Sequence, residues 1–389
     1  MLIIRYRSFG TAYYAGFMKT CRAIRKDTLA EYVFREEIPL WERLAIGSAW
    51  PLPFQIDRQL MDSMPIPSYS IAIRTLGTAG EKFRQELASI KAQTRQPDRV
   101  LVYIAEGYAR PPFQVGREEY VWVKKGMVAQ RALPYDEVAS DCILLLDDDV
   151  LLAPDSAERL LRAMATHDAD CVAADVFRNH AMPFRTKLFA AVTGWVLPHG
   201  SPEWAFRMRR SGSFSYNARP VKPYYASQTC GGPAMLWRKS ALRRICLADE
   251  CWLDALGFAY GDDALESYKL YRNGGRLGVL YDAGIRNLDA ASASAAFKRS
   301  PERVYLRTKA SLLTWWRSCY RNGADTPLSR MSAAIAFGCK ALWLLPVMSG
   351  ASLAWHDRKV LPSYLRGLRD GRREARSAAF RALPPYILP

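Results

Sequence analysis

Between residues 68 and 290, short apolar runs alternate with stretches whose apolar residues have helical spacing. The runs that predict strands are 70–75 (SIAIRT), 99–106 (RVLVYIAE), 119–124 (EYVWVK) and 143–146 (ILLL). The stretches that predict helices are 81–93, 127–133 and 155–164. Strands that alternate with helices predict βαβ units and a mainly parallel sheet. We therefore expect an α/β fold in this part of the chain.

The alternation weakens after residue 170, and the chain changes character again near residue 300. Residues 207–220 are rich in Ser, Gly, Asn and Pro and predict a loop. A turn and a short apolar element follow at 231–242, then a helix from about Asp263 to Tyr271 and a strand at 277–282. We expect three segments: an N-terminal helical extension (1–65), the α/β domain (66–295), and a basic, aromatic, helical C-terminal region (296–389).

Three adjacent carboxylates, Asp147, Asp148 and Asp149, directly follow the most apolar of the predicted strands. Open α/β sheets bind their ligands at the carboxyl ends of strands. Three neighbouring carboxylates repel one another and are costly to desolvate, so a positive partner is expected. Mg²⁺ or Mn²⁺ carrying a phosphorylated substrate would satisfy them, because these ions prefer oxygen ligands and phosphates. The alternative is a solvated acidic turn.

A second acidic pair, Asp262 and Asp263, follows Gly261 at the start of a predicted helix. The helix dipole favours acidic residues there, so a purely structural, helix-capping role is one alternative. The functional alternative is a catalytic base that accepts the proton of an acceptor hydroxyl. Both acidic groups come after strand-like or loop segments, which suits one shared cleft.

Composition limits the partners and the compartment. The 389 residues are half hydrophobic, with a formal net charge of +17 and a pI near 9.6. Such a charge indicates an acidic partner: nucleic acid, anionic lipid or a phosphorylated substrate. The eight cysteines form no CxxC pair, which favours reduced thiols in the cytosol. No HExxH motif is present, which argues against a zinc hydrolase, and we predict no signal peptide.

One apolar segment, 331–355, is a membrane candidate, although it contains Lys340 and Pro346. Inserting a central lysine costs about 2.5–3.5 kcal/mol, close to what the strongly apolar residues return. A span is therefore not required, and a helix lying in the interface or packed on the main domain fits as well. The basic stretch 356–376 follows it. We expect a peripheral protein on the cytoplasmic, inner face of the membrane, held by the anionic surface. The alternative is a core helix.

Four motifs in order and spacing resemble the family 2 glycosyltransferases of the GT-A fold. They are the segment from SYSIAIRTLGTAG to IAEGY, KKGMVAQRAL, LLLDDDV, and the later pair GGPAMLWRKSAL and FAYGDDALESYKLYRNGG. The resemblance covers about residues 68–290. It implies a metal-dependent inverting transferase that moves a sugar from a nucleotide-diphosphate sugar to a hydroxyl of a glycan or lipid-linked acceptor, in cell-surface polysaccharide synthesis. The metal would be Mg²⁺ or Mn²⁺.

The resemblance also implies roles for single residues. The residues that would bind the donor are Thr75, Glu106, Arg131, Asp147 and Asp148. Asp149 would bind the metal together with Asp147. The third metal contact is Asn287, Asp289 or water, because Asn287 occupies the position where the family often has a histidine. On the acceptor side, Gly232 shapes the loop, Asp263 is the base and Asp262 supports it.

Three other interpretations compete with this one. A nucleotidyltransferase that makes sugar nucleotides also uses acidic metal ligands on an α/β sheet, but IRTLGTAG lacks its usual Gly-rich pattern. A nucleic-acid-binding protein would explain the charge but not the two acidic groups, and no zinc-finger or RNP pattern is present. We therefore expect no nucleic acid partner. A family member without catalytic activity is the third alternative.

Overall fold

The fold is described from a computed structural model, which covers residues 66–176, 188, 192, 196–199, 201–217, 219–257, 261–288 and 299–387. The backbone alone is described at 196–199. Two of the expectations above, the helical extension over residues 1–65 and the metal contact Asp289, lie outside these residues. Residues 63–389 cluster into one compact unit.

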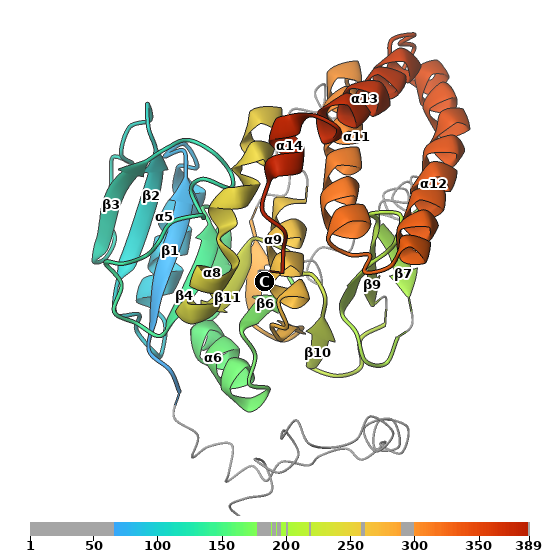
Figure 1. Cartoon of the computed structure of the whole chain (residues 1–389). Helices are drawn as coiled ribbons and strands as arrows, with labels where there is room; N and C mark the ends of the chain where they lie inside the picture. The colour runs from blue at the N-terminus through green and yellow to red at the C-terminus, as the bar shows by residue number, and fades with distance from the viewer. Residues whose placement is uncertain are drawn as a thin grey trace, which may run out of the picture. The chain divides into compact units, whose positions relative to one another are not determined.

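An eight-stranded sheet forms the centre of this unit, in the order β10-β12-β6-β11-β4-β1-β2-β3 (Figure 1). Its strands are β1 (Tyr69–Thr75), β2 (Val100–Ala105), β3 (Glu118–Val123), β4 (Cys142–Asp147), β6 (Cys171–Ala174), β10 (Tyr224–Ser227), β11 (Ala234–Arg238) and β12 (Leu277–Leu280). Only β11 and β10 run against the others. The mixed α/β fold with a mainly parallel sheet is therefore confirmed.

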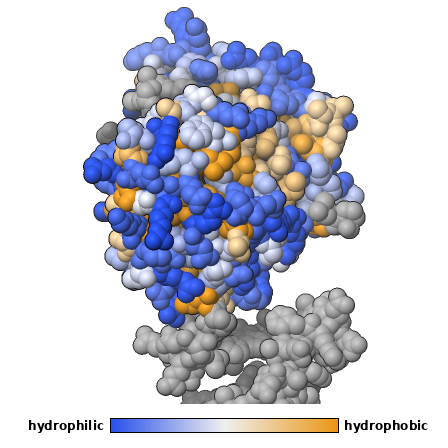
Figure 2. Space-filling view, turned by 90° about the vertical axis from the view of Figure 1, so that its left-hand side faces the viewer, coloured by the Kyte–Doolittle hydropathy of each residue, from blue (hydrophilic) through white to orange (hydrophobic). Residues whose placement is uncertain are grey.

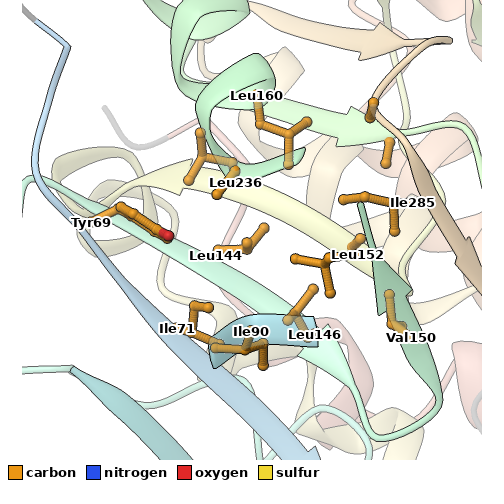
Figure 3. Close-up of a cluster of buried hydrophobic side chains, with 14 of the residues drawn as sticks. Tyr69, Ile71, Ile90, Leu144, Leu146, Val150, Leu152, Leu160, Leu236 and Ile285 are labelled. Carbon is orange, nitrogen blue, oxygen red and sulfur yellow. The ribbon is translucent and has the colours of Figure 1, made fainter. Parts of the chain in front are cut away.

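Helices cover both faces of the sheet because its central strand is apolar on both sides. In β4, Leu144 and Leu146 belong to one buried cluster, while Ile143 and Leu145 belong to another. Alternate residues of a strand point to opposite faces. The first cluster contains residues of α5 (Glu81–Lys91) and α6 (Ser156–Thr166), as Figure 3 shows for Ile90 and Leu160. The second includes α8 (Lys239–Ile245) and α9 (Asp262–Arg272).

Two small sheets lie beside the large one. Strand β5 (Val150–Leu152) pairs antiparallel with β13 (Ile285–Asn287), which brings Asn287 opposite Val150. Strand β9 (Phe214–Asn217) pairs antiparallel with β8 (Phe206–Met208) and parallel with β7 (Val196–His199). The expectation of a loop over 207–220 is therefore wrong in part, because its central residues form a short hairpin.

The helix expected over Met127–Leu133 is also wrong, because these residues form turns. The carboxylate of Asp254 accepts hydrogen bonds from the backbone N–H groups of Val128 and Ala129, at 2.9 and 3.0 Å. These N–H groups are thus fixed by a residue far along the chain, and Pro134 follows within a few residues. The 3₁₀-helix η2 (Leu247–Leu256) supplies Asp254.

The C-terminal region is helical, as expected from its sequence. It contains α11 (Pro301–Trp315), a π-helical turn (Trp316–Arg321), α12 (Pro327–Ala354), α13 (Val360–Ala375) and α14 (Ala378–Ala382). Helices α11, α12 and α13 lie together beyond the β10 end of the sheet (Figure 1). A fully buried ion pair joins the π-helical turn to η2, with Arg317 Nη2 2.7 Å from Glu250 Oε1.

Candidate active site

The acidic triplet begins at the carboxyl end of β4, beside the end of β1. The two strands are parallel neighbours in register, with Arg74 opposite Asp147. The hydroxyl of Thr75, the last residue of β1, donates a hydrogen bond of 2.5 Å to Asp148 Oδ2. Burial is the main reason that the pKa of Asp148 is raised, and the neighbouring Asp147 adds to the effect. The structure therefore brings Thr75 and the triplet together at one edge of the sheet.

Two arginines neutralise Asp147. Arg74 Nε donates to Asp147 Oδ1 at 2.5 Å, and Arg131 Nη2 donates to the same oxygen at 2.9 Å. Burial opposes ionisation of this carboxyl group, but the two guanidinium groups outweigh it and lower its pKa. The positive partner that the triplet requires is thus supplied for Asp147 by the protein itself.

The same arginines connect the triplet to the second acidic pair, which begins 113 residues after Asp149 in the chain. Arg74 Nη1 donates to Asp262 Oδ2 at 3.2 Å, and Arg131 Nη1 forms an ion pair with Asp263 Oδ1. Arg131 also donates to the backbone oxygen of Gly232, at 2.6 Å. The two acidic groups therefore share one site, as their positions after strand-like and loop segments suggested.

The two members of the second pair differ in access to solvent. The side chain of Asp263 is 26% exposed, whereas that of Asp262 is 5% exposed. The pKa of Asp263 is raised to about 6 by its buried surroundings and by Asp262, against the opposing effect of Arg131. A carboxylate with this pKa is largely ionised at neutral pH and still binds protons readily, which suits a general base. Of the two, Asp263 is the carboxylate that an incoming molecule can reach.

Gly232 is required by its closeness to Asp263. A Cβ atom at residue 232 would lie 1.9 Å from the carboxyl carbon of Asp263. A side chain at residue 232 would push the Asp263 carboxylate aside, so glycine lets the loop before β11 pass close to the first turn of α9. The absence of a side chain at Gly232 therefore leaves room for the Asp263 carboxylate.

Asp149 meets Asn287 through the small sheet of β5 and β13. Asn287 Nδ2 donates to Asp149 Oδ1 at 3.3 Å, and the Asp149 backbone oxygen accepts from Leu288 N–H at 2.7 Å. Within the described ranges, no three His, Cys, Asp or Glu side chains are grouped to hold a metal ion. The oxygens of Asp149 fit Mg²⁺ or Mn²⁺ that arrives with a diphosphate, since such ions need only one or two protein carboxylates beside the phosphates.

Glu106 differs from the other expected residues in its exposure and its contacts. It follows β2 at the same edge of the sheet, and its backbone N–H donates to the Val123 oxygen at 2.8 Å. Its side chain is exposed, and no contact between described residues joins it to the triplet. A role for Glu106 at the donor would require the donor to extend beyond Thr75 toward β2.

Three further charged residues belong to the site, and the sequence analysis did not identify them. Besides Arg74, they are the fully buried Glu86 and Glu266. Glu266 Oε2 lies 3.9 Å from Arg131 Nη1, and neither of its carboxyl oxygens has a hydrogen-bond partner among the described residues. Glu86 Oε2 accepts from the Val150 N–H at 3.4 Å, beneath the triplet. Burial raises the pKa of both glutamates well above their usual values.

A sequence signal existed for these residues. Arg74 is a charged residue inside an apolar strand, and Glu86 falls on the apolar face of its helix, between Phe83 and Leu87. Glu266 follows Asp263 by one helical turn, and its neighbour Leu265 is buried. Charged residues in positions that the pattern assigns to the core are rare without a partner or a function.

A comparison with protein-family models identifies the family of the chain. The family model described as "Glycosyltransferase like family 2" matches residues 82–305, more than half of the chain. The chain belongs to this family, which confirms the resemblance in the sequence and favours it over the nucleotidyltransferase and nucleic-acid-binding alternatives.

Solved structures show a distant likeness, and no curated protein matches the chain. One is GalNAc-T7 with UDP, GalNAc and Mn²⁺, at a TM-score of 0.44 and 10% identity, covering 71% of this chain. This chain spans only 56% of the length of that protein. Another is the mannosyltransferase PcManGT from Pyrobaculum calidifontis with GDP-Man and Mn²⁺, at 0.43 and 14%, covering 82% of this chain and 83% of that one.

Proposed function

We propose that the protein is an inverting glycosyltransferase, which moves a sugar from a nucleotide-diphosphate sugar to a hydroxyl of a glycan or lipid-linked acceptor in cell-surface polysaccharide synthesis. The observation that carries the proposal is the position of Asp263. It is the accessible carboxylate of its pair, and Arg131 holds it beside the triplet. One site thus offers a base for the acceptor next to carboxylates suited to the donor.

The proposed reaction is a single in-line displacement. Asp263 accepts the proton of the acceptor hydroxyl, whose oxygen forms a bond to the anomeric carbon of the sugar. The bond from that carbon to the diphosphate breaks, and the diphosphate leaves with the electron pair. Because attack and departure occur on opposite sides, the configuration inverts. Asp262 accepts a hydrogen bond from Arg74 and lies 3.9 Å from Arg131 Nη1, so it supports the base by helping to hold both guanidinium groups in place.

On the donor side, we assign the nucleotide and sugar to the edge formed by Thr75, Asp147 and Asp148, with Glu106 farther out along the base. Arg131 orders this edge through its ion pair with Asp147. Asp149, oriented by the hydrogen bond from Asn287, would hold Mg²⁺ or Mn²⁺ together with the diphosphate. When bound, the metal would neutralise the charge of the leaving diphosphate. Asp147 itself is satisfied by arginines and is better suited to a sugar hydroxyl.

A donor screen tests the proposal. Calorimetry with UDP, GDP, dTDP and ADP, each with Mg²⁺, with Mn²⁺ and with EDTA, should find one nucleotide that binds only with metal. The matching nucleotide sugars should then be turned over, and the anomeric configuration of the product can be assigned by NMR. Inversion is expected. Retention of configuration, or turnover of none of these donors, would contradict the proposal.

We also propose that α12 and α13 hold the enzyme on the inner face of an anionic membrane. Of the described helices, only α12 is long and apolar enough to cross a membrane, and only 11% of its apolar window is buried. Its exposed apolar residues lie at helical spacing on one side: Leu328, Met331, Ile335 and Leu342. The exposed arginines of α13, such as Arg366 and Arg372, add attraction of about 1 kcal/mol each near an anionic surface.

Vesicle flotation at low salt tests the membrane proposal with the whole chain. The exposed apolar side of α12 differs from the face of the molecule on the β3 side, which is mostly hydrophilic and has a hydrophobic patch in its upper half (Figure 2). Ile335→Ser with Leu342→Ser should lower flotation with anionic vesicles, because both side chains are exposed on α12. The matched control removes two exposed apolar residues elsewhere, Val121→Ser with Leu76→Ser. Equal flotation of the two double variants would refute the assignment to α12.

A further inference from the structure

Glu266 is a buried carboxyl group for which the reaction proposed above has no role. It lies one helical turn after Asp262 and Asp263 on α9, so the three side chains are on the same side of the helix. Glu266 is fully buried, whereas the side chain of Asp263 is 26% exposed. The proposed base therefore lies on the solvent-accessible side of the cluster, and Glu266 lies on its inner side.

Glu266 meets the rest of the cluster at Arg131. Its Oε2 atom lies 3.9 Å from Arg131 Nη1, the nitrogen that is paired with Asp263. This distance is too long for a hydrogen bond, and neither oxygen of Glu266 has a hydrogen-bond partner among the described residues. The Nε atom of Arg131 is also without a partner there. Glu266 is therefore near enough to compete for Arg131, and it is not bonded to it.

The cluster has no spare positive charge for Glu266. Its ion pairs among described residues join two guanidinium groups to three aspartates, namely Arg74 and Arg131 to Asp147, Asp262 and Asp263. When these aspartates are ionised, the cluster already carries one excess negative charge. A buried carboxyl group without a hydrogen bond keeps its proton under such conditions. Burial accordingly raises the pKa of Glu266 well above its usual value, and the opposing effect of Arg131 is smaller.

Two other titratable groups respond to the charge of Glu266, and neither supplies a counter-charge. Tyr135 follows the 127–133 turn, and Cys251 lies in η2. Burial is the main cause that raises the pKa of each group, to about 11 for Cys251, and Glu266 contributes to both effects. Both groups are therefore uncharged at neutral pH, and the charges that act on Glu266 are those of the two arginines and their aspartates.

We propose that Glu266 is a positioning residue, which remains an uncharged carboxylic acid beside Arg131 and so leaves that guanidinium group to Asp263 and Asp147. The positioning role rests on the proposed function, whereas the uncharged state of Glu266 does not. An ionised Glu266 would draw Arg131 Nη1 inward, away from Asp263. The uncharged acid thus keeps the base and the triplet joined through one arginine.

Urea unfolding of the whole chain at several pH values tests whether Glu266 is uncharged. A carboxyl group that is protonated in the folded state and ionised in the unfolded state makes the protein less stable as pH rises above its unfolded pKa, and this effect ends at its folded pKa. Glu266→Gln removes the effect. From about pH 6 upward, the unfolding constant of the wild type, divided by that of Glu266→Gln, should rise about tenfold per pH unit until Glu266 ionises. A ratio that does not change with pH would overturn the proposal.

The matched control for unfolding is Glu158→Gln. Glu158 is a half-buried glutamate of α6 that is paired with Arg162, outside the buried cluster. The unfolding constant of the wild type, divided by that of Glu158→Gln, should not change with pH over the same range. A rise as steep as the one expected for Glu266→Gln would show that the effect is not specific to Glu266, and it would overturn the assignment.

The pH profile of sugar transfer tests the positioning role. On the alkaline side of the optimum, kcat/KM of the wild type should fall at least about tenfold, because displacement of a reacting group by about 1 Å can cost more than this. The midpoint of the fall should agree with the pH at which the ratio of unfolding constants stops rising, because both report the same proton. Glu266→Gln should lack the alkaline fall. A purely structural role would change activity at every pH and leave the shape of the profile unchanged, so profiles of the same shape would overturn the positioning role.

The two measurements also separate this proposal from the proposed function. The pH-dependent ratio of unfolding constants, in a protein that transfers no sugar, would contradict the transfer and with it the positioning role, while Glu266 would remain an uncharged acid. Sugar transfer that depends on Asp263, with the same alkaline profile in the wild type and Glu266→Gln, would keep the proposed function and contradict the positioning role.

Discussion

Replacing Gly232 by alanine should disable catalysis while leaving the donor site intact. The added methyl carbon would lie 1.9 Å from the Asp263 carboxyl carbon, whereas ordinary contacts begin near 3.4 Å. The carboxylate must therefore move by about 1.5 Å, the difference between these two distances. Arg131 cannot follow it freely, because the same guanidinium donates to Asp147 and to the Gly232 oxygen. The base is thus displaced from its ion pair and from the acceptor.

A displacement of about 1 Å at a reacting group can reduce the rate about 10²-fold. We expect Gly232→Ala to lower kcat by about this factor, with the affinity for the nucleotide diphosphate unchanged. The rate of nucleotide release measures kcat, and calorimetry measures the affinity for the nucleotide diphosphate. The control is Gly338→Ala on α12, where a Cβ would have no neighbour within 4 Å. Wild-type kcat in Gly232→Ala would refute the close relation between Gly232 and the base.

Three further predictions follow from the site and its support. Asp149→Asn should remove most of the metal dependence of nucleotide binding, and calorimetry that finds affinity and metal dependence unchanged would contradict this. The rate constant kcat/KM should rise with pH through about 6, because Asp263 must lose its proton to act as a base; a flat profile from about pH 5 to 7 would contradict this. Glu250→Gln leaves the buried Arg317 without its counter-ion and should lower the free energy of unfolding by about 3–5 kcal/mol. The control is Asp136→Asn, which breaks an exposed ion pair with Arg243 and should change the free energy of unfolding by less than about 1 kcal/mol. Equal urea midpoints for Glu250→Gln and Asp136→Asn would contradict the reasoning.

The sequence predicted the strands well because each buried strand is a short, nearly continuous apolar run. Residues 70–75 and 143–146 fall within β1 and β4, and the helix that begins at Asp262 ends before Asn273, as its Gly-rich stop indicates. The failures came from long-range contacts. The 127–133 turn is fixed by Asp254, and the hairpin in 207–220 is covered by α11 through Trp315 and Gly212. The local pattern of apolar and polar residues does not reveal contacts with residues so far away in the chain.

The same limit applies to the candidate site. The two acidic groups were recognisable because adjacent carboxylates repel one another and therefore indicate a positive partner or a function. The neutralisation of these groups was not recognisable, since the sequence analysis assigned Arg131 only to the donor and Arg74 reaches Asp262 across 188 positions of the chain. We had expected a metal ion to neutralise the triplet, and for Asp147 two arginines do so instead. The choice of Asp263 over Asp262 gains support from their exposure, which no pattern of residues reveals.

The most direct test of the central claim is turnover by Asp263→Asn with the donor that the screen identifies. Nucleotide release in the presence of acceptor should fall by about 10²-fold or more, while the affinity for the nucleotide diphosphate remains that of the wild type, because a base acts in the transition state rather than in donor recognition. Near wild-type turnover would contradict the assignment, and a loss confined to Asp262→Asn would transfer the role of base to that residue.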